Sequence, residues 1–153
     1  MSRPRSEDQQ TRAVTELLEL RGVVEAGPDA VAGVLLDVRP GGRSPLARTG
    51  RLVEEDGNEF VLSIEGSRIT VTVDRPARTV VQQGEWWYRG VTSVHLDPRG
   101  ALVVHQIFNV AEGNRWAVRW VSRGPLGAAP ATFAAQIAEL GAELHCAAWV
   151  LDD

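Results

Sequence analysis

Lysine is absent from this 153-residue sequence, and all 16 basic side chains are arginines. No physical requirement excludes lysine from every exposed site, so its absence indicates the codon bias of a GC-rich, bacterial genome. The arginines are scattered without a basic run, and the net charge is −4. Because a nucleic-acid-binding domain gathers positive charge on one face, nucleic acid is not an expected partner.

Cysteine is almost absent too, since Cys146 is the one thiol in the sequence. A single cysteine excludes an internal disulfide and fits a reducing compartment. There is also no apolar run with the length of a transmembrane helix or the form of a secretory leader. We therefore expect a cytoplasmic, one-domain protein without a membrane span; whether it forms a homodimer is open.

The residues that carry chemistry are few. His95, His105 and His145 show no metal-ligand spacing, and no glycine-rich phosphate loop is present. His145 and Cys146 are neighbours in a predicted helix and point in different directions, which argues against a Cys/His nucleophile. The sequence predicts no metal site and no cofactor, and it names no reaction.

The C-terminal stretch Pro130–Leu151 is the strongest helical signal. Its large apolar residues recur with helical spacing and predict a core-facing stripe, made of Phe133, Ile137, Leu140, Leu144 and Leu151. Pro130 suits the first helical position. Gly141 costs about 1 kcal/mol relative to alanine in a helix, so we expect either a close approach of backbone or ligand there, or a simple packing glycine.

The sequence predicts a flexible segment over residues 1–17 and one domain over residues 18–153, which includes the C-terminal helix. A strand over Leu18–Ala26 is followed by a short helix that starts at Gly27-Pro28-Asp29 and cannot outlast Pro40. Six strands are then predicted between turn signals, over Arg51–Glu55, Glu59–Ile64, Arg68–Asp74, Arg78–Leu96, Ala101–Ala111 and Arg115–Arg123. This order predicts an α+β fold in which a curved antiparallel sheet of about seven strands wraps around the long C-terminal helix.

The phrase VVEAGPDAVAGVLLDV over residues 23–38, together with this element order, resembles the START-like superfamily, also called SRPBCC or Bet v 1-like. The resemblance covers roughly Leu18–Leu151. It implies a helix-grip fold with a hollow between the sheet and the C-terminal helix. It also implies a hydrophobic small molecule, lipid or polyketide-like, as the partner.

Hairpin register indicates which residues line such a hollow. A two-residue loop after Asp97 pairs Arg89 with Phe108 and Val91 with Gln106. With the strand predicted over Arg115–Arg123, one face is rich in tryptophan, and we take it as concave. Together with Gly141, its candidate ligand-binding residues are Trp87, Arg89, Gln106, Phe108, Trp116 and Trp120. The opposite face carries Trp86, Tyr88, Thr92, His105 and Asn109, and a bulge at Gly84 or Gly90 would exchange the two.

The candidate residues have plainer explanations as well. The aromatic residues could form an ordinary core, and Arg89 could form a salt bridge to Glu85 or be exposed. Three functions follow from the resemblance. The first is a hydrophobic-ligand-binding protein in which Arg89 or Gln106 orients the ligand. The second is a polyketide cyclase or aromatase in which Arg89 stabilises an enolate, with Tyr88, His95 or Asn109 carrying protons. The third is an interaction module with a filled interior.

Overall fold

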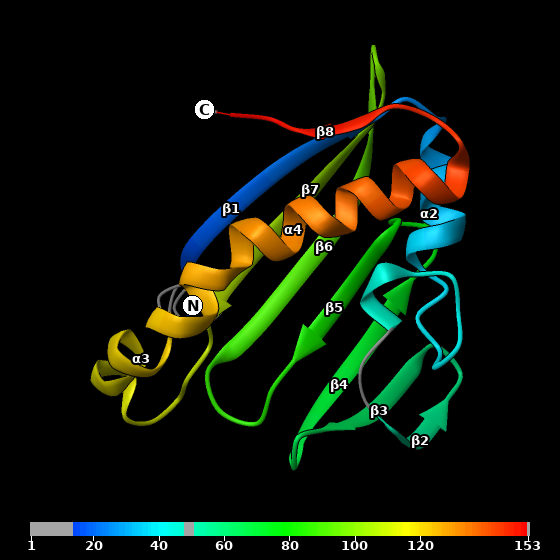
Figure 1. The fold of residues 1–153 in the computed structure, drawn as a ribbon. Helices are drawn as coiled ribbons and strands as arrows, with labels where there is room; N and C mark the ends of the chain where they lie inside the picture. The colour runs from blue at the N-terminus through cyan, green and yellow to red at the C-terminus, as the bar shows by residue number, and fades with distance from the viewer. Residues whose placement is uncertain (1–13, 48–50, 153) are drawn as a thin grey trace, which may run out of the picture.

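One antiparallel sheet of eight strands dominates the fold in the computed structural model, which describes residues 14–47 and 51–152 (Figure 1). The strand order across the sheet is β2-β3-β4-β5-β6-β7-β1-β8. The strands are β1 (Thr15–Val24), β2 (Arg51–Asp56), β3 (Glu59–Ile64), β4 (Ser67–Asp74), β5 (Thr79–Gln83), β6 (Tyr88–Asp97), β7 (Gly100–Asn109) and β8 (Ala148–Val150).

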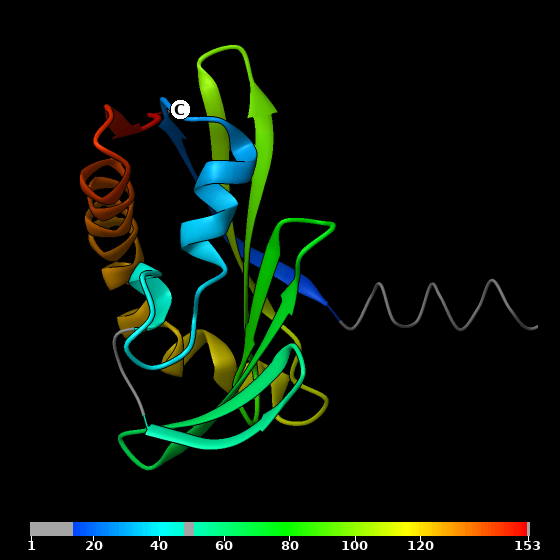
Figure 2. The same ribbon diagram turned by 90° about the vertical axis from the view of Figure 1, so that its right-hand side faces the viewer.

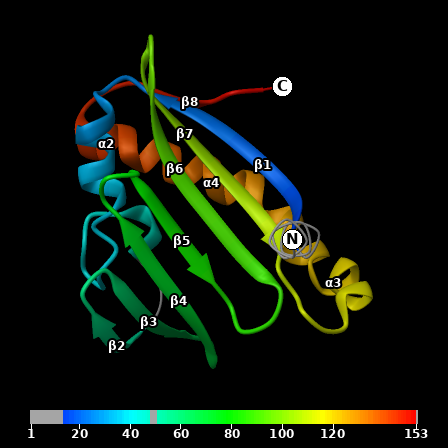
Figure 3. The same cartoon turned by 180° about the vertical axis from the view of Figure 1, so that it is seen from behind.

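Helix α2 (Pro28–Leu35), a 3-10 turn η1 (Pro45–Ala47) and the long helix α4 (Arg123–Leu144) lie on one side of this sheet (Figure 2). The short helix α3 (Arg115–Val121) lies at the end of the sheet, beyond β7 (Figure 1). Figure 2 shows the curved sheet facing α4 and α2, and Figure 3 shows the opposite face of the sheet with none of the described helices across it. The predicted α+β helix-grip architecture is therefore confirmed, with eight strands instead of about seven.

Several predicted elements match the structure closely. The strand predicted over Glu59–Ile64 is β3, and α2 starts at Pro28, where the missing N–H costs no hydrogen bond. The long run Arg78–Leu96 is two strands, because the chain bends between Gln83 and Tyr88. The first strand starts at Thr15, inside the segment predicted to be flexible, while residues 1–13 of that segment lie outside the described residues.

The strand predicted over Arg115–Arg123 is wrong, because α3 occupies this segment. Only Val118 of this helix is buried. The cause is topological: β7 lies between β6 and β1, so a strand that followed β7 would find no free edge beside it. β1 occupies the position beside β7 that the next strand would occupy in a simple meander.

The C-terminal helix starts earlier and ends earlier than predicted. It starts at Arg123, so Pro125 lies in the first turn and Pro130 lies inside the helix. Pro130 has no backbone N–H, so the helix loses one hydrogen bond there. Apolar contacts of the preceding turn offset this loss, because Leu126 and Ala129 pack on a buried cluster. The helix ends at Leu144 and the chain turns back into β8.

That turn is a Schellman motif. His145 has a left-handed backbone (φ 53°), its N–H donates to the carbonyl of Ala142, and the N–H of Cys146 donates to the carbonyl of Gly141 at 2.9 Å. The chain reverses there, so Trp149 lies on β8 opposite Val23 and not on the helix.

The core fills the space between the sheet and the helices. The predicted helical stripe is confirmed in Phe133, Ile137 and Leu140, which are almost fully buried. Leu144 is partly buried against the same cluster, whereas Leu151 lies beyond the helix. At Gly22 of β1 an added side chain would meet Cδ1 of Ile137 at 2.7 Å, so this glycine lets α4 approach the sheet closely. Within the described residues, no helix is long and apolar enough to cross a membrane.

Candidate functional site

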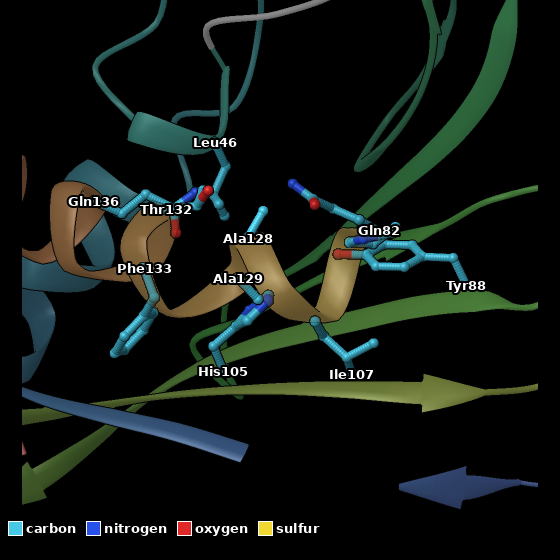
Figure 4. Close-up of a pocket in the computed structure, with 11 residues that line it drawn as sticks. Leu46, Gln82, Tyr88, His105, Ile107, Ala128, Ala129, Thr132, Phe133 and Gln136 are labelled. Atoms are coloured by element: carbon cyan, nitrogen blue, oxygen red, sulfur yellow. The ribbon is translucent and has the colours of Figure 1, made fainter. Parts of the chain in front are cut away.

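A hollow remains between the N-terminal half of α4 and the concave face of the sheet. It has two adjoining compartments of about 290 and 200 Å³. Both compartments are bordered by Leu46, Gln82, Tyr88 and Gln136, so they lie side by side. Figure 4 shows the larger compartment, with His105 and Ile107 below α4, Tyr88 beside it on the right and Leu46 above it.

The concave face is the one that the sequence analysis assigned to the outside. The predicted register is confirmed: Arg89 pairs with Phe108 and Val91 with Gln106. However, the residues that alternate with these four are the ones that face α4. On β6 and β7 the concave residues are Tyr88, Gly90, Thr92, Val94, Ala101, Val103, His105, Ile107 and Asn109. The strand wrongly predicted over Arg115–Arg123 added Trp116, Val118 and Trp120 to the face that carries Arg89 and Phe108. With these residues included, that face was the more apolar one, and it was therefore predicted to be concave.

Tyr88 provides a hydroxyl group in the hollow. Its ring lies across Gly90, where an added Cβ would come within 2.6 Å of the hydroxyl oxygen. Trp87 holds the ring from the side in an edge-to-face contact at 5.5 Å. Burial raises the pKa of Tyr88 above its ordinary value, so the phenol stays protonated and can donate a hydrogen bond.

His105 provides an imidazole that stays neutral. It is 9% exposed, and its Nδ1 lies 2.8 Å from the hydroxyl oxygen of Thr92. Its ring stacks on Phe133 of α4 with a centroid distance of 6.1 Å. Desolvation by burial lowers the pKa of His105 to about 4. With Nδ1 engaged by Thr92, Nε2 is the ring nitrogen left for a ligand.

The remaining walls are mostly apolar. The larger compartment is completed by Ile107, Phe133, Ala128, Ala129 and Pro125, and the smaller one by Leu62, Ile64, Ile69, Val71 and Pro45. Polar side chains are few and come from Gln82, Thr132 and Gln136. An apolar space with a few placed donors and acceptors is typical of a site for a small organic molecule.

Three of the predicted site residues lie on the other face of the sheet. Arg89, Gln106 and Phe108 are partly exposed there. The amide of Gln106 donates to the carboxylate of Glu16 on the neighbouring β1 at 3.3 Å. The Nε atom of Arg89 is buried without a hydrogen-bond partner among the described residues. The structure therefore does not bring these three side chains into the hollow, and their role in ligand binding stays a prediction.

The predicted tryptophans have different locations. Trp87 is buried in a second cluster with Ile107 and Val118, and through its contact with Tyr88 it adjoins the hollow. Trp116 and Trp120 lie on α3, 72% and 54% exposed, and line neither compartment. Of the six predicted sheet residues, Trp87 alone is beside the hollow.

The close approach expected at Gly141 involves backbone. An added side chain there would come within 2.9 Å of both the Cys146 carbonyl oxygen and Cβ of Ala148. The glycine therefore makes room for the turn into β8.

Gly141→Ala is expected to lower the melting temperature. Overpacking of this kind costs about 1–3 kcal/mol, which outweighs the roughly 1 kcal/mol that alanine gains in helix propensity. Gly127→Ala is the matched control on the same helix, because nothing lies within 4 Å of the added atom, and it should raise the melting temperature. Equal shifts in thermal melts of the two variants would contradict the crowding at Gly141.

Sequence reasoning missed Thr92, His105 and Phe133 as parts of one site. His105 and Thr92 are opposite each other in the predicted β6–β7 register, which is a signal that could have paired them. The stack on Phe133 depends on how α4 lies on the sheet and leaves no local signal. Over residues 14–47 and 51–152, no cluster of three or more histidine, cysteine, aspartate or glutamate side chains could hold a metal ion.

Comparison with known proteins gives likeness in structure only. No protein-family model matches the sequence, and no curated protein matches it. Among solved structures, the chain is similar to the di-domain ARO/CYC StfQ from the steffimycin biosynthetic pathway, with 13% identity and a TM-score of 0.53. This match covers 89% of the chain and 52% of StfQ, so the chain spans about half the length of that protein.

Two weaker structural matches cover more of the other chain. Ara h 8.0201 is 14% identical over 78% of this chain and 95% of its own, with a TM-score of 0.43. TTHA0849 from Thermus thermophilus is 15% identical over 80% of this chain and 91% of its own, with a TM-score of 0.41. The match to StfQ and the sheet wrapped around α4 show that the chain has a helix-grip fold.

Proposed function

We propose that this protein binds a hydrophobic small molecule, lipid or polyketide-like, in the hollow between the sheet and α4. The observation that carries the proposal is the pairing of apolar walls with two fixed polar groups, the Tyr88 hydroxyl and Nε2 of His105. Apolar contact with Ile107, Phe133 and Leu46 supplies affinity, and the two polar groups orient one oxygen-bearing part of the ligand.

The volume of the hollow limits the ligand. The larger compartment, about 290 Å³, is near the lower end of the usual range for small-molecule sites, and the adjoining one extends it. Both polar groups are neutral near pH 7, because the pKa of Tyr88 is raised and that of His105 is lowered. A neutral ligand with hydroxyl or carbonyl groups therefore fits better than a strongly charged one.

A thermal melt against fatty acids, sterols, flavonoids and aromatic polyketides tests this proposal. A ligand at a hundred times its dissociation constant stabilises by about 2.7 kcal/mol, which raises the melting temperature of a domain of this size by roughly 5–10 °C. A shift confined to one chemical class supports the proposal. No shift across the panel would contradict it and favour a partner protein instead.

Tyr88→Phe is expected to weaken binding of a ligand found in this way about fivefold, the effect of one lost neutral hydrogen bond. Gly90→Ala should weaken it too, because the added methyl displaces the Tyr88 ring while leaving its hydroxyl intact. Arg89→Ala is the control on the other face of the sheet. Titration calorimetry measures all three, and a loss at Arg89 equal to that at Tyr88 would move the site to the convex face.

A second candidate function is an aromatase or cyclase acting in the same hollow. The neutral imidazole of His105 favours it: if the Thr92 hydroxyl donates to Nδ1, the ring proton lies on Nε2 and can polarise a ligand carbonyl. A histidine with a pKa of about 4 is a weak general base at pH 7, so hydrogen-bond donation suits it better than proton abstraction.

Cyclisation assays of His105→Gln distinguish catalysis from binding. If the protein is an enzyme, turnover of a poly-β-ketone substrate should fall at least tenfold while ligand affinity changes much less. Equal losses of affinity and turnover, or no turnover in the unmodified protein, would leave ligand binding as the function.

A further inference from the structure

Helix α3 and the first residue of α4 present an unusual exposed surface, here called the α3 patch: Trp116, Arg119, Trp120 and Val121 of α3 and Arg123 of α4. Trp116 is 72% exposed, Trp120 54% and Val121 47%. Trp116 and Trp120 are four residues apart, so they lie on the same face of the helix. Packing against the domain does not explain these side chains, because Val118 is the one residue of α3 that is buried.

Acidic side chains are missing from the same stretch of the sequence, so its net charge is positive. Between Gly113 and Ala138 the sequence has three arginines and no aspartate or glutamate, although the whole chain has a net charge of −4. The guanidinium carbons of Arg119 and Arg123 lie 5.5 and 4.6 Å from the ring centroid of Trp120. Neither arginine forms an ion pair with a carboxylate of the described chain, so their charge is available to an external anion.

We infer that the α3 patch docks on an anionic lipid surface. Indole rings favour the interfacial layer of a bilayer, where their apolar body and N–H are both accommodated. Arginines next to them are attracted by the negative surface potential of anionic lipids. A surface helix with these two kinds of side chain is typical of binding in the plane of the membrane interface.

The shape of the patch favours a lipid surface over an acidic protein. A stable protein interface buries about 800 Å² on each partner, and α3 is a seven-residue helix that projects at a corner of the molecule in Figures 1 and 3. A fluid bilayer can enclose a small convex projection, whereas a folded partner needs a matching cavity.

The position of the patch relates it to the hollow. Arg123 precedes Pro125 by two residues, and Pro125 and Ala128, both exposed, line the larger compartment. Docking through α3 therefore brings this side of the hollow close to the lipid layer, from which an apolar ligand could enter. The docking itself does not depend on the proposed ligand-binding function.

Vesicle sedimentation tests the inference. The full chain is mixed with phosphatidylcholine vesicles that contain either no phosphatidylglycerol or about 30% phosphatidylglycerol, in low salt and in high salt. Binding to the anionic vesicles in low salt, reduced by high salt and by removal of phosphatidylglycerol, is expected. No binding to the anionic vesicles, or equal binding to both compositions, would overturn the inference.

Variants then locate the surface. Arg119→Gln/Arg123→Gln should lower the partition coefficient about thirtyfold, since each arginine near an anionic surface contributes about a factor of five. Trp116→Ala/Trp120→Ala should lower it as well, and Trp149→Ala, an exposed tryptophan on β8, should not. Unchanged binding in both double variants would refute the α3 patch as the docking surface. Salt-dependent binding of polyglutamate through these residues, without vesicle binding, would reassign the patch to an acidic protein.

Discussion

Phe133→Ala is expected to lower the free energy of unfolding by about 3–5 kcal/mol, the usual cost of truncating a buried phenylalanine. Phe133 is 2% exposed, packs in the main core and stacks on His105. Its removal enlarges the hollow and leaves the imidazole without its aromatic neighbour. Urea denaturation measures the loss from the shift of the midpoint at constant slope.

Phe108→Ala is the matched control, because it makes the same change on the opposite face of the sheet. Phe108 is partly exposed there, so its truncation should cost clearly less than that of Phe133. The two values together test which face of the sheet is concave. A larger loss for Phe108→Ala than for Phe133→Ala would place the core against the face of the sheet that carries Phe108.

Acidification is expected to destabilise the protein through His105 by roughly 3 kcal/mol. In the unfolded chain this histidine takes up a proton near pH 6.5, whereas burial lowers its pKa in the folded chain to about 4. Between these values the unfolded state binds more protons, so stability falls as the pH is lowered through this range. Above pH 6.5 and below pH 4 this group adds no further pH dependence.

Urea denaturation at about pH 7.5 and at about pH 4.5 measures the acid loss of stability, and variants show how much of it comes from His105. In the double variant Thr92→Val/His105→Phe, the loss of stability on acidification should be smaller. Thr92 is replaced together with His105 because its buried hydroxyl would otherwise lose its hydrogen-bond partner. His95→Gln, at an exposed histidine on the same strand as Thr92, should retain the acid loss of the unmodified protein. An unchanged loss in the double variant would exclude His105 as its source.

Local patterns were sufficient for much of the fold. The hairpin of β6 and β7 has the predicted register because Asp97-Pro98-Arg99-Gly100 closes it with two residues between the paired Asp97 and Gly100. The apolar stripe through Phe133, Ile137 and Leu140 follows helical spacing and is buried as expected. In both cases the residues that decide the structure are close in sequence.

The errors come from interactions between distant segments. In α3, Trp116, Val118 and Trp120 alternate as in a strand, and the same spacing of Trp116 and Trp120 fits one face of a helix. The choice depends on β1, which occupies the edge of β7 that a further strand would need. Because of this error, the wrong face of the sheet was predicted to be concave. Tyr88 and His105 were therefore predicted on the face away from the hollow, although the pairing of their strands was predicted correctly.

The location of β1 between β7 and β8 bears on how the chain acquires its fold during synthesis. β1 is the first strand to leave the ribosome, but its pairing partners are made only when residues 100–109 and 148–150 have been added. Until then Val23 and Val24, both fully buried in the finished sheet, have no strand beside them. Such pairing across most of the chain slows folding and prolongs exposure of an unpaired edge. Nascent chains that stop before Gly100 should therefore depend on chaperones more than the completed protein.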